Sequence, residues 1–476
     1  MPHRIFEIDE ILRDIVWHMK DTGEATTVSF ACCCKSFEEP ALSLLWVSML
    51  LKELVTLFPS GIRTGATKPT EEEWNRFRRY TSWIRLLLVD LTPGYATPEV
   101  FLLLDLIASS PKNGPTQQAI FPNLHGLTWF GKPSSLIHLP SVASPVLTDL
   151  RFHTAFQRET VHLPGVYAPL ELVINSTLSP PNLRSLCLDT PPESNPSPEL
   201  KRGVVDLVLR CGSALTTLQL GFELPESVIL HLMSLPHLST WRVEQPAPTG
   251  LVSSPFRPTV SFTQLEYLSL CTTTLRGWLS LIAALVGENS HPPPAPHAPG
   301  FTFGNLTNLD VNPPSGQQCL HSCIFPLTNS DISLLADTLP RMESIYLGIS
   351  CFFNTCQTTF RSLHTLSTRC PQLQRVCLHV NTTTLVQDIA SVFEEGDQQA
   401  ETRGTRVDPS VGRRDYPLSL QYVSYLPLEA SVGVGDLEAI VKGFFDISMT
   451  IDDVTVSNSN SELWAKVSEG IEALRV

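Results

Sequence analysis

The sequence is poor in charged residues. Asp, Glu, Lys and Arg make up 17% of its 476 residues, where a typical domain has about 25%. Acidic residues outnumber basic ones, and the net charge is −14. Nucleic acids and anionic membrane surfaces need clusters of Lys and Arg, so this balance predicts neither as a partner. Hydrophobic residues, at 42%, are enough for a packed core.

Long hydrophobic runs are also missing. No segment reaches the roughly 18 consecutive apolar residues that a membrane-spanning helix needs. The first residues include Arg4, Glu7 and Asp9, and they lack the basic start and the uninterrupted apolar stretch of a secretory signal. We therefore expect an intracellular protein, cytoplasmic or nuclear. Its 12 cysteines are then expected to be buried thiols rather than disulfides.

The sequence has no recognisable motif for catalysis, nucleotide binding or metal binding. Consecutive cysteines at 32–34 would point about 100° apart on a helix, so they cannot all reach one ion. The Cys and His residues at 319–323 and 351–356 do not form paired Cys-x-x-Cys ligands. Gly433-Val-Gly435 lacks the third glycine of a dinucleotide loop. We expect no metal, no cofactor and no enzymatic activity.

Three short helices are predicted near the N-terminus. Apolar residues recur at intervals of three and four from Ile8 to Met19, which is one face of an amphipathic helix. Asp21-Thr22-Gly23 ends this helix, and residues 25–33 predict a second one. The segment from Ser36 to Glu39 has the form of a capping box, which predicts the start of a third helix.

The next segment predicts a loop, a helix and a strand in turn. Residues 59–70 are rich in Gly, Pro, Ser and Thr, a composition typical of loops. Thr70 followed by three glutamates predicts a helix N-terminus, with Trp74 and Phe77 on one side of the helix. The apolar run 84–90 then predicts a short strand.

The remaining chain contains a repeated unit of the form Leu-x-x-Leu-x-Leu with conservative replacements. The starts of successive copies lie 23 to 47 residues apart by subtraction, whereas a regular leucine-rich repeat runs about 20–29. Chance spacing of leucines in an ordinary α/β protein is the alternative, and ten copies in order argue against it. The copies begin at Leu124, Leu147, Leu183, Leu215, Leu238, Leu265, Leu306, Met342, Leu373 and Leu420.

The spacing within each copy predicts its structure. The fourth and sixth positions alternate with polar residues, so both point to one face of a short strand. The first Leu lies in the preceding turn and closes the same core. One strand and one helix per unit predict an α/β fold, an irregular leucine-rich-repeat solenoid with parallel strands. Helix-like stretches between the copies are 204–209, 225–233, 278–286, 331–339 and 361–369, and predicted loop insertions are 191–198, 291–300 and 394–415.

The N-terminal residues resemble an F-box. The similarity is carried by the segment from Ile5 to Arg13, by Cys32-Cys-Cys-Lys-Ser-Phe37, and by Glu39-Pro-Ala-Leu-Ser-Leu-Leu-Trp46. It is closest to fungal F-box proteins with a Cys-Lys-Ser-aromatic core and a terminal Leu-Trp. Asp9 stands where the family usually has Pro. The segment Trp74-x-x-Phe77-x-x-Tyr80 is similar to the one that follows the motif in that group.

The resemblance implies a three-helix F-box module over 1–50, a helical linker over 51–83 and the solenoid over 84–476. It implies binding to a Skp-type adaptor and, through that adaptor, to a cullin–RING ubiquitin ligase. The residues that match the family's hydrophobic contacts are Ile5, Phe6, Ile8, Leu12, Ile15, Phe30, Ala31, Cys34, Leu45 and Trp46.

Physical reasoning gives a compatible view of the three helices. Fewer than about 50 residues bury too little surface to be stable alone. The helices therefore need a second surface to cover their apolar side chains. That surface is an adaptor's in one interpretation. In the other it is the solenoid's own, and the helices only cap its first repeat.

The solenoid also predicts a face for binding a protein target. Side chains between the repeat leucines line the inner, concave face of the predicted sheet, and Tyr and Arg among them are enriched in protein interfaces. The leading hypothesis is therefore a substrate-recruiting subunit, and the alternative is a repeat scaffold without a role in a ligase. The candidate target-binding residues are Asp149, Arg151, Arg242, Tyr267, Asp310, Tyr346, Arg375 and Tyr422.

Overall fold

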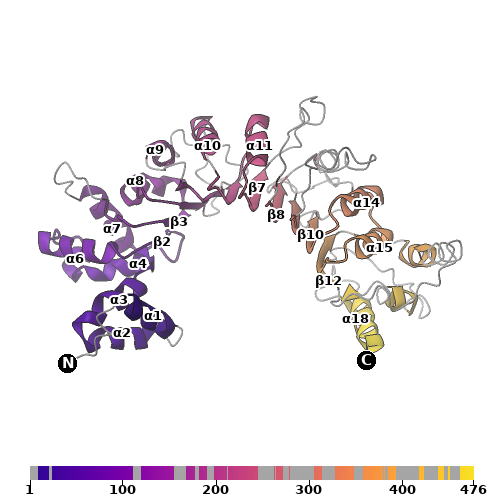
Figure 1. The fold of residues 1–476 in the computed structure, drawn as a ribbon, viewed down its shortest axis with the longest axis horizontal. Coiled ribbons are helices and arrows are strands. Elements are labelled where there is room, and N and C mark those ends of the chain that lie inside the picture. The colour runs from indigo at the N-terminus through magenta and orange to yellow at the C-terminus, as the bar shows by residue number, and fades with distance from the viewer. Residues whose placement is uncertain are drawn as a thin grey trace. The chain divides into compact units, whose positions relative to one another are not determined.

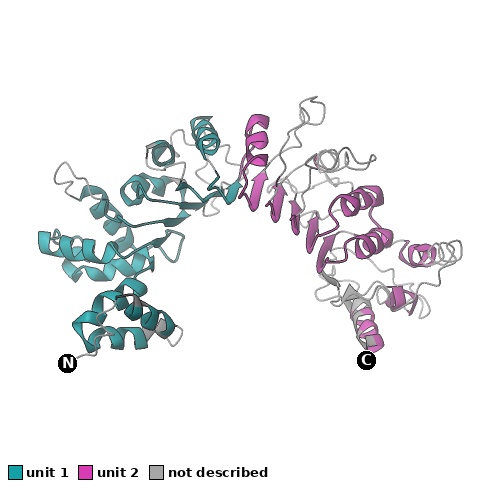
Figure 2. Cartoon of the chain, in the orientation of Figure 1, with its two compact units in different colours: residues 1–220 teal, residues 221–476 magenta. Residues whose placement is uncertain are grey.

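The structure is a computed structural model of the whole chain. It forms two compact units, residues 1–220 and residues 221–476 (Figure 2). The described residues are 9–20, 24–110, 119–154, 168–176, 182–189, 198–211, 213–244, 262, 264–271, 278, 305–312, 327–347, 357–378, 380, 384–392, 418–422, 438–443, 449–450 and 461–475.

Unit 1 begins with three helices and continues as alternating strands and helices (Figure 1). Its strands are β1 (Ser48–Leu50), β2 (Leu86–Asp90), β3 (Gly126–Gly131), β4 (Asp149–Thr154), β5 (Ser185–Asp189) and β6 (Thr217–Leu220). Its helices are α1 (Asp9–Lys20), α2 (Glu24–Cys33), α3 (Lys35–Leu45), α4 (Leu51–Leu54), η2 (Val55–Leu57), α5 (Ser60–Arg63), α6 (Glu71–Thr81), α7 (Pro98–Ser109), η3 (Pro133–His138), α8 (Leu139–Val142), α9 (Ala168–Ser176) and α10 (Pro198–Arg210).

Unit 2 continues the same alternation. Its strands are β7 (Thr240–Glu244), β8 (Tyr267–Cys271), β9 (Asn308–Asn312), β10 (Ser344–Leu347), β11 (Arg375–Leu378), β12 (Leu418–Tyr422) and β13 (Met449–Thr450). Its helices include α11 (Glu226–Met233), α14 (Asn329–Thr338), α15 (Phe360–Arg369) and α18 (Ser461–Arg475). Except for Trp278, which is buried, the predicted helix at 278–286 lies outside the described residues, as do the predicted insertions at 291–300 and 394–415.

The N-terminal helices confirm two of the three predicted starts and correct the third. α1 lies where the apolar spacing predicts it, and α2 covers the predicted segment 25–33. α3 begins at Lys35, so the capping box predicted at Ser36 is wrong. Cys34 is the extended residue before the helix, and its carbonyl accepts the Phe37 amide at 3.0 Å. Pro40 lies inside α3, where its ring is buried in the module.

The segment after the three helices also differs in part from its prediction. The expected loop at 59–70 contains α5, a single helical turn that buries Ile62. The turn ends at Arg63, and Gly65 follows its C-cap residue with a φ of +75°, a conformation that glycine adopts at little cost. The predicted helix is confirmed as α6: Thr70 and Glu73 exchange hydrogen bonds in a capping box. The sheet starts early, because β1 pairs with β2.

All strand pairs described within each unit are parallel and join neighbours in sequence. In unit 1 the order runs β1 to β6, and in unit 2 it runs β7 to β13. Helices of each unit lie along one side of its strands (Figure 1). Each predicted copy of the repeat therefore corresponds to one strand, β3 to β12, and the α/β repeat solenoid is confirmed.

A main-chain hydrogen bond sets the register between repeats. The carbonyl of His125, the second residue of its copy, accepts the amides of both Thr148 and Asp149 in the next copy, each at 2.8 Å. Corresponding pairs recur in unit 2, where the Glu343 carbonyl accepts the amides of Gln374 and Arg375. Because the second residues of neighbouring copies meet in this way, the leucines of successive strands align in rows.

The aligned rows form the core. Leu127, Leu150, Leu186 and Leu218 occupy one register row and are at most 1% exposed. The first leucines of the copies, such as Leu147 and Leu183, are fully buried as well. The predicted roles of positions one, four and six are therefore confirmed. The face of the strands that carries the intervening residues is called the open face below.

The tenth copy was placed in the wrong register. The sequence pattern makes Leu420 its first residue and Val423 its fourth. In the structure Leu420 pairs with Val376, which is the fourth residue of the preceding copy. The register also shifts between Val376 and Cys377. The prediction was wrong because the strand lies three residues earlier than the pattern indicates, and Leu418 and Leu420 provide its apolar alternation.

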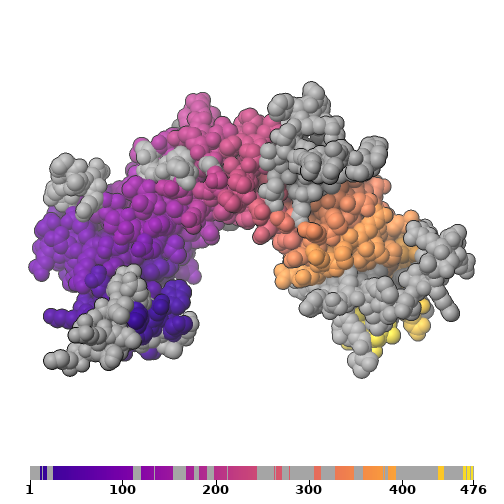
Figure 3. Space-filling view, in the orientation of Figure 1, coloured from indigo at the N-terminus to yellow at the C-terminus, as the bar shows by residue number. Residues whose placement is uncertain are grey.

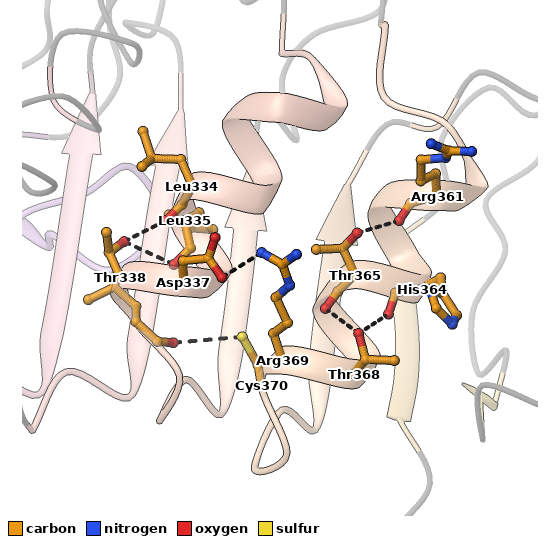
Figure 4. A network of polar contacts seen from close by, with 11 residues as sticks. Leu334, Leu335, Asp337, Thr338, Arg361, His364, Thr365, Thr368, Arg369 and Cys370 are labelled. Carbon is orange, nitrogen blue, oxygen red and sulfur yellow. Dashed lines mark hydrogen bonds and ion pairs between the residues drawn. The ribbon is translucent and has the colours of Figure 1, made fainter. Parts of the chain in front are cut away.

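Polar contacts join the helices of adjacent repeats in unit 2. Figure 4 shows α14 and α15 linked by the ion pair of Asp337 with Arg369 and by the Cys370 thiol, which donates to the Leu339 carbonyl. At the other end of the pair, the Asn329 side chain accepts the Thr359 amide at 2.9 Å. These contacts fix how one helix lies on the next, although an exposed ion pair alone contributes little stability.

Two buried thiols make the fold sensitive to alkaline pH. Burial raises the pKa of Cys211 to about 11. Burial, and then the Asp310 carboxylate, raise the pKa of Cys377 to about 12. The ordinary value is 9.0. Because the folded-state pKa is the higher one, the stabilisation is complete below pH 9 and is lost as the pH rises toward 11 to 12.

We expect the free energy of unfolding to fall by about 2 kcal/mol per thiol between pH 8 and pH 10.5. Urea unfolding at both pH values measures this loss. The double variant Cys211→Ala/Cys377→Ala starts from a lower stability but loses less of it over this range. Cys32→Ala, at an exposed thiol, is the matched control and keeps the wild-type pH dependence. An equal pH dependence in all three proteins would contradict the assignment.

Candidate interaction surfaces

The three N-terminal helices form a small module with its own core. Val16, Ala31 and Ala41 are buried together, and Phe30 and Leu44 pack against them. Leu12 is 3% exposed, so it also lies inside. The phenyl rings of Phe30 and Phe37 stack at 4.3 Å between centroids, which joins α2 to α3.

The predicted adaptor contacts fall into three groups. Leu12 and Ala31 are buried by the chain itself, where they support the module from within. Ile5, Phe6 and Ile8 lie outside the described residues. The half-buried residues, which keep part of their surface open, are Ile15, Phe30, Cys34, Leu45 and Trp46.

The module also contacts α6, the longest helix of the linker segment. The ring of Trp46 lies 4.6 Å from that of Tyr80 in α6. Glu38 of α3 forms an ion pair of 3.1 Å with Arg79 of α6. Trp46 is therefore partly covered by its own chain, and part of the predicted adaptor surface is shared with the linker.

Two exposed apolar side chains of the module escaped the sequence prediction. Val28 of α2 is 49% exposed and Trp17 of α1 is 58% exposed. Trp17 stands 140° around the helix from Leu12, at 100° per residue, so it lies off the buried stripe. A large apolar residue outside the stripe of an amphipathic helix is the signal that could have indicated it.

The three consecutive cysteines differ from their prediction. They were expected as buried thiols, but Cys32 and Cys33 are exposed and Cys34 is half-buried. The hydroxyl of Ser36 lies 2.7 Å from the Cys34 sulfur. This hydrogen bond, with further ones from the Ser36 and Phe37 amides, lowers the pKa of Cys34. Elsewhere the prediction of buried thiols is confirmed at Cys187, Cys211, Cys370 and Cys377.

The open face of unit 1 combines apolar and charged side chains. Arg151 is exposed and Asp149 is half-buried, and they stand on the same side of β4 as predicted. His153, also on β4, contacts both neighbouring strands. Its ring stacks on the Phe130 ring of β3 at 4.7 Å between centroids, and its imidazole lies 3.5 Å from the Asp189 carboxylate of β5. Leu86, 47% exposed on β2, is an apolar member of this face that lies outside the ten repeat copies.

The open face of unit 2 carries most of the predicted target-binding residues. The Tyr267 and Ser269 hydroxyls both donate to an Asp310 carboxylate oxygen, at 3.4 and 3.2 Å. Burial and the Asp310 charge raise the pKa of Tyr267. Arg242 lies in the register row of Ser269 and Asp310, and it is exposed.

The last predicted members of this face are placed by register. Tyr346 follows Asp310 in the same row, and Arg375 is exposed at the start of β11. Tyr422 ends β12 opposite Cys377, and its side chain lies outside the described residues. The structure thus brings Tyr267, Asp310 and Tyr346 onto adjacent strands, while Asp149 and Arg151 belong to unit 1.

Within the described ranges, no three His, Cys, Asp or Glu side chains gather in a way that could hold a metal ion. The Cys and His residues at 319–323 and 351–356 lie outside these ranges. Helices long and apolar enough to cross a membrane are absent from the same part of the chain.

The chain is similar in structure to chains of known structure. No family model matches the sequence, and no curated protein matches it. Among solved structures, a chain of the "Crystal structure of Rad7 and Elc1 complex in yeast" matches with 11% identity and a TM-score of 0.38. The match covers 90% of this chain and 94% of that one. At this level of similarity, any functional conclusion has to come from the residues of this chain.

Proposed function

We propose that the chain is the substrate-recruiting subunit of a Skp–cullin–F-box ubiquitin ligase and has no enzymatic activity of its own. The N-terminal module binds a Skp-type adaptor, and the open face of the repeats binds a protein target. The chain then acts inside the cell by proximity. It raises the effective concentration of the target near an activated ubiquitin held by other subunits.

One observation carries the proposal. The residues that resemble an F-box fold as three short helices that leave apolar side chains uncovered. Val28 is half-exposed on α2, and Ile15, Phe30 and Leu45 are only half-buried. Each large apolar side chain contributes about 1.5–3 kcal/mol when a partner buries it fully. A few such residues are enough for a stable complex.

The target-binding role is supported by composition. The open face of unit 2 presents Tyr267 and Tyr346 together with Arg242 and Arg375. Tyr and Arg dominate the energetically important positions of protein interfaces. Parallel strands that end side by side hold these residues on a rigid surface, which lowers the entropy that binding has to overcome.

A titration of the full chain with a purified Skp-type adaptor tests the proposal. We expect a 1:1 complex in size-exclusion chromatography at about 10 μM of each protein, a concentration at which a micromolar complex persists. Absence of a complex at this concentration would reject the ligase role. The same result would favour a second candidate, a repeat scaffold whose helices only cap the solenoid.

The capping role has its own observation in favour. The contacts of Trp46 with Tyr80 and of Glu38 with Arg79 attach the module to α6 of the linker. A terminal repeat needs such a cover over its apolar end. One side of the module can cover the first repeat while another side binds the adaptor. The adaptor titration therefore distinguishes a module that caps the solenoid and binds the adaptor from one that only caps the solenoid.

A further inference from the structure

A cleft of about 620 Å³ lies between the N-terminal module and the first repeats of unit 1. In Figure 3 the indigo surface of the module meets the violet surface of the following elements. The cleft has a volume typical of ligand sites, about 300–1,000 Å³. Its lining includes Asp14, Trp17, Glu39, Trp83, Arg85 and Asn123.

The module supplies one wall of the cleft. Asp14 and Trp17 stand on the side of α1 away from Leu12 and Val16, which face the module core. Trp17 keeps 58% of its surface exposed. An indole left this open exposes apolar surface that a ligand would cover favourably. Glu39, from α3, is exposed on the same wall.

The start of the sheet supplies the opposite wall, and this wall is held in place. Trp83 packs edge-on against Tyr80, with ring centroids 5.6 Å apart, and the Arg79 guanidinium lies 5.5 Å from its ring. The Asn123 side chain donates to the Ser82 carbonyl at 2.7 Å, which ties the turn before β3 to the turn before β2. The cleft is therefore formed before any ligand arrives.

The charged residues that line the cleft have no partners among the described residues. Asp14, Glu39 and Arg85 are exposed, and their side chains form no ion pair or hydrogen bond within that part of the chain. Two carboxylates and two indoles in one cleft favour a cation. The carboxylates attract its charge, and the faces of indole rings bind ammonium and guanidinium groups.

We propose that this cleft binds a segment of a protein partner that carries a lysine or arginine side chain. The cation lies against Trp17 and Trp83 and is neutralised by Asp14 and Glu39. Arg85 donates to a backbone carbonyl or an acidic residue of the same segment and so fixes its direction. The chain's net charge of −14 adds a long-range attraction for such a segment. The proposal is independent of adaptor binding, because it uses a different side of α1.

A random heptapeptide library displayed on phage, selected against the full chain, provides the probe. We expect the selected peptides to be enriched in Lys and Arg. A fluorescein-labelled selected peptide is then titrated by fluorescence anisotropy. Replacing its arginine by citrulline, or its lysine by norleucine, removes only the charge and weakens binding at least about tenfold.

Matched variants of the full chain locate the site. Trp17→Ala/Glu39→Gln is expected to weaken peptide binding at least about tenfold, because it removes one indole and one carboxylate that hold the cation. The control Tyr95→Ala/Glu72→Gln changes a ring of similar exposure, 57%, and an exposed carboxylate outside the cleft, and it binds as wild type. All these residues are at the surface, and an unchanged circular dichroism spectrum confirms folding.

Three results would overturn the proposal. They are selection of no binding peptide, equal binding of the charged and neutral peptides, and equal binding by wild type and the Trp17→Ala/Glu39→Gln variant. Adaptor binding is measured on the Trp17→Ala/Glu39→Gln variant as well, so that a failure of the peptide site is distinguished from a failure of the ligase role. The affinity for the adaptor stays at the wild-type level if the two sites are separate.

Discussion

Replacing Ile15 and Val28 by glutamate abolishes the expected complex with a Skp-type adaptor. Both side chains keep open surface on the module, and Val28 is 49% exposed. A charge placed in an apolar interface has to be desolvated without a partner, which costs far more than the contact that it replaces. Together the two changes weaken the complex by at least about 100-fold. Isothermal titration calorimetry with the full chain measures the loss.

The design of this experiment depends on the burial that the structure shows. Leu172→Glu alters an apolar residue of α9 that is 55% exposed, so it controls for a new surface charge in the same unit. It should bind the adaptor as wild type does. Leu12→Glu is a poor test, because Leu12 is 3% exposed and its replacement unfolds the module whether or not a partner exists. Wild-type affinity in the Ile15→Glu/Val28→Glu variant would exclude this surface as the adaptor site.

Truncating either buried repeat tryptophan is expected to destabilise its unit by about 3–5 kcal/mol. Trp129 on β3 and Trp241 on β7 are fully buried. Trp129 fills position six of its copy, and Trp241 fills position four. Trp129→Ala leaves a large cavity between Val89 and Phe152, and Trp241→Ala leaves one beside Leu268. Hydrogen exchange of the strand amides measures the loss separately for each unit.

The phenylalanine variants of the same residues separate packing from hydrogen bonding. The Trp129 indole donates to the Ser135 hydroxyl at 3.0 Å, and that hydroxyl donates to the Lys132 carbonyl. The Trp241 indole nitrogen has no hydrogen-bond partner among the described residues. Trp129→Phe therefore costs about 1 kcal/mol more than Trp241→Phe. Equal losses would show that the indole hydrogen bond contributes nothing.

Some local features could not be predicted from the sequence because they depend on tertiary packing. The composition of residues 59–70 predicts a loop, yet Ile62 is buried and stabilises the turn of α5. α3 starts at Lys35 because the backbone of Cys34 is extended, and no local sequence pattern predicts that backbone conformation. The exposure of Cys32 and Cys33 follows from which side of α2 the other helices cover. Helix periodicity alone did not give that side, because α2 is not clearly amphipathic.

The sequence predicted some residues of the candidate surfaces and not others. Positions between the repeat leucines placed Asp149, Arg151, Tyr267 and Asp310 on one face of their strands, because side chains in a strand alternate strictly. The apolar residue Leu86 was missed, since β2 lacks the full repeat pattern. The Tyr267 hydroxyl, which donates to the Asp310 carboxylate, lies 43 residues away in the sequence. This contact could be predicted only with the strand register known.

By itself the sequence determined that this chain forms parallel strands in series, and in nine copies it placed a leucine or, at 342, a methionine in the turn before the strand. Period-two alternation in recurring copies favours this arrangement, because stacked strands bury the repeat leucines together. Only the tertiary structure decided which side chains of the three helices stay uncovered and where a cleft opens. Those features depend on segments from Asp14 to Asn123 meeting in space, and no local pattern encodes contacts over that separation.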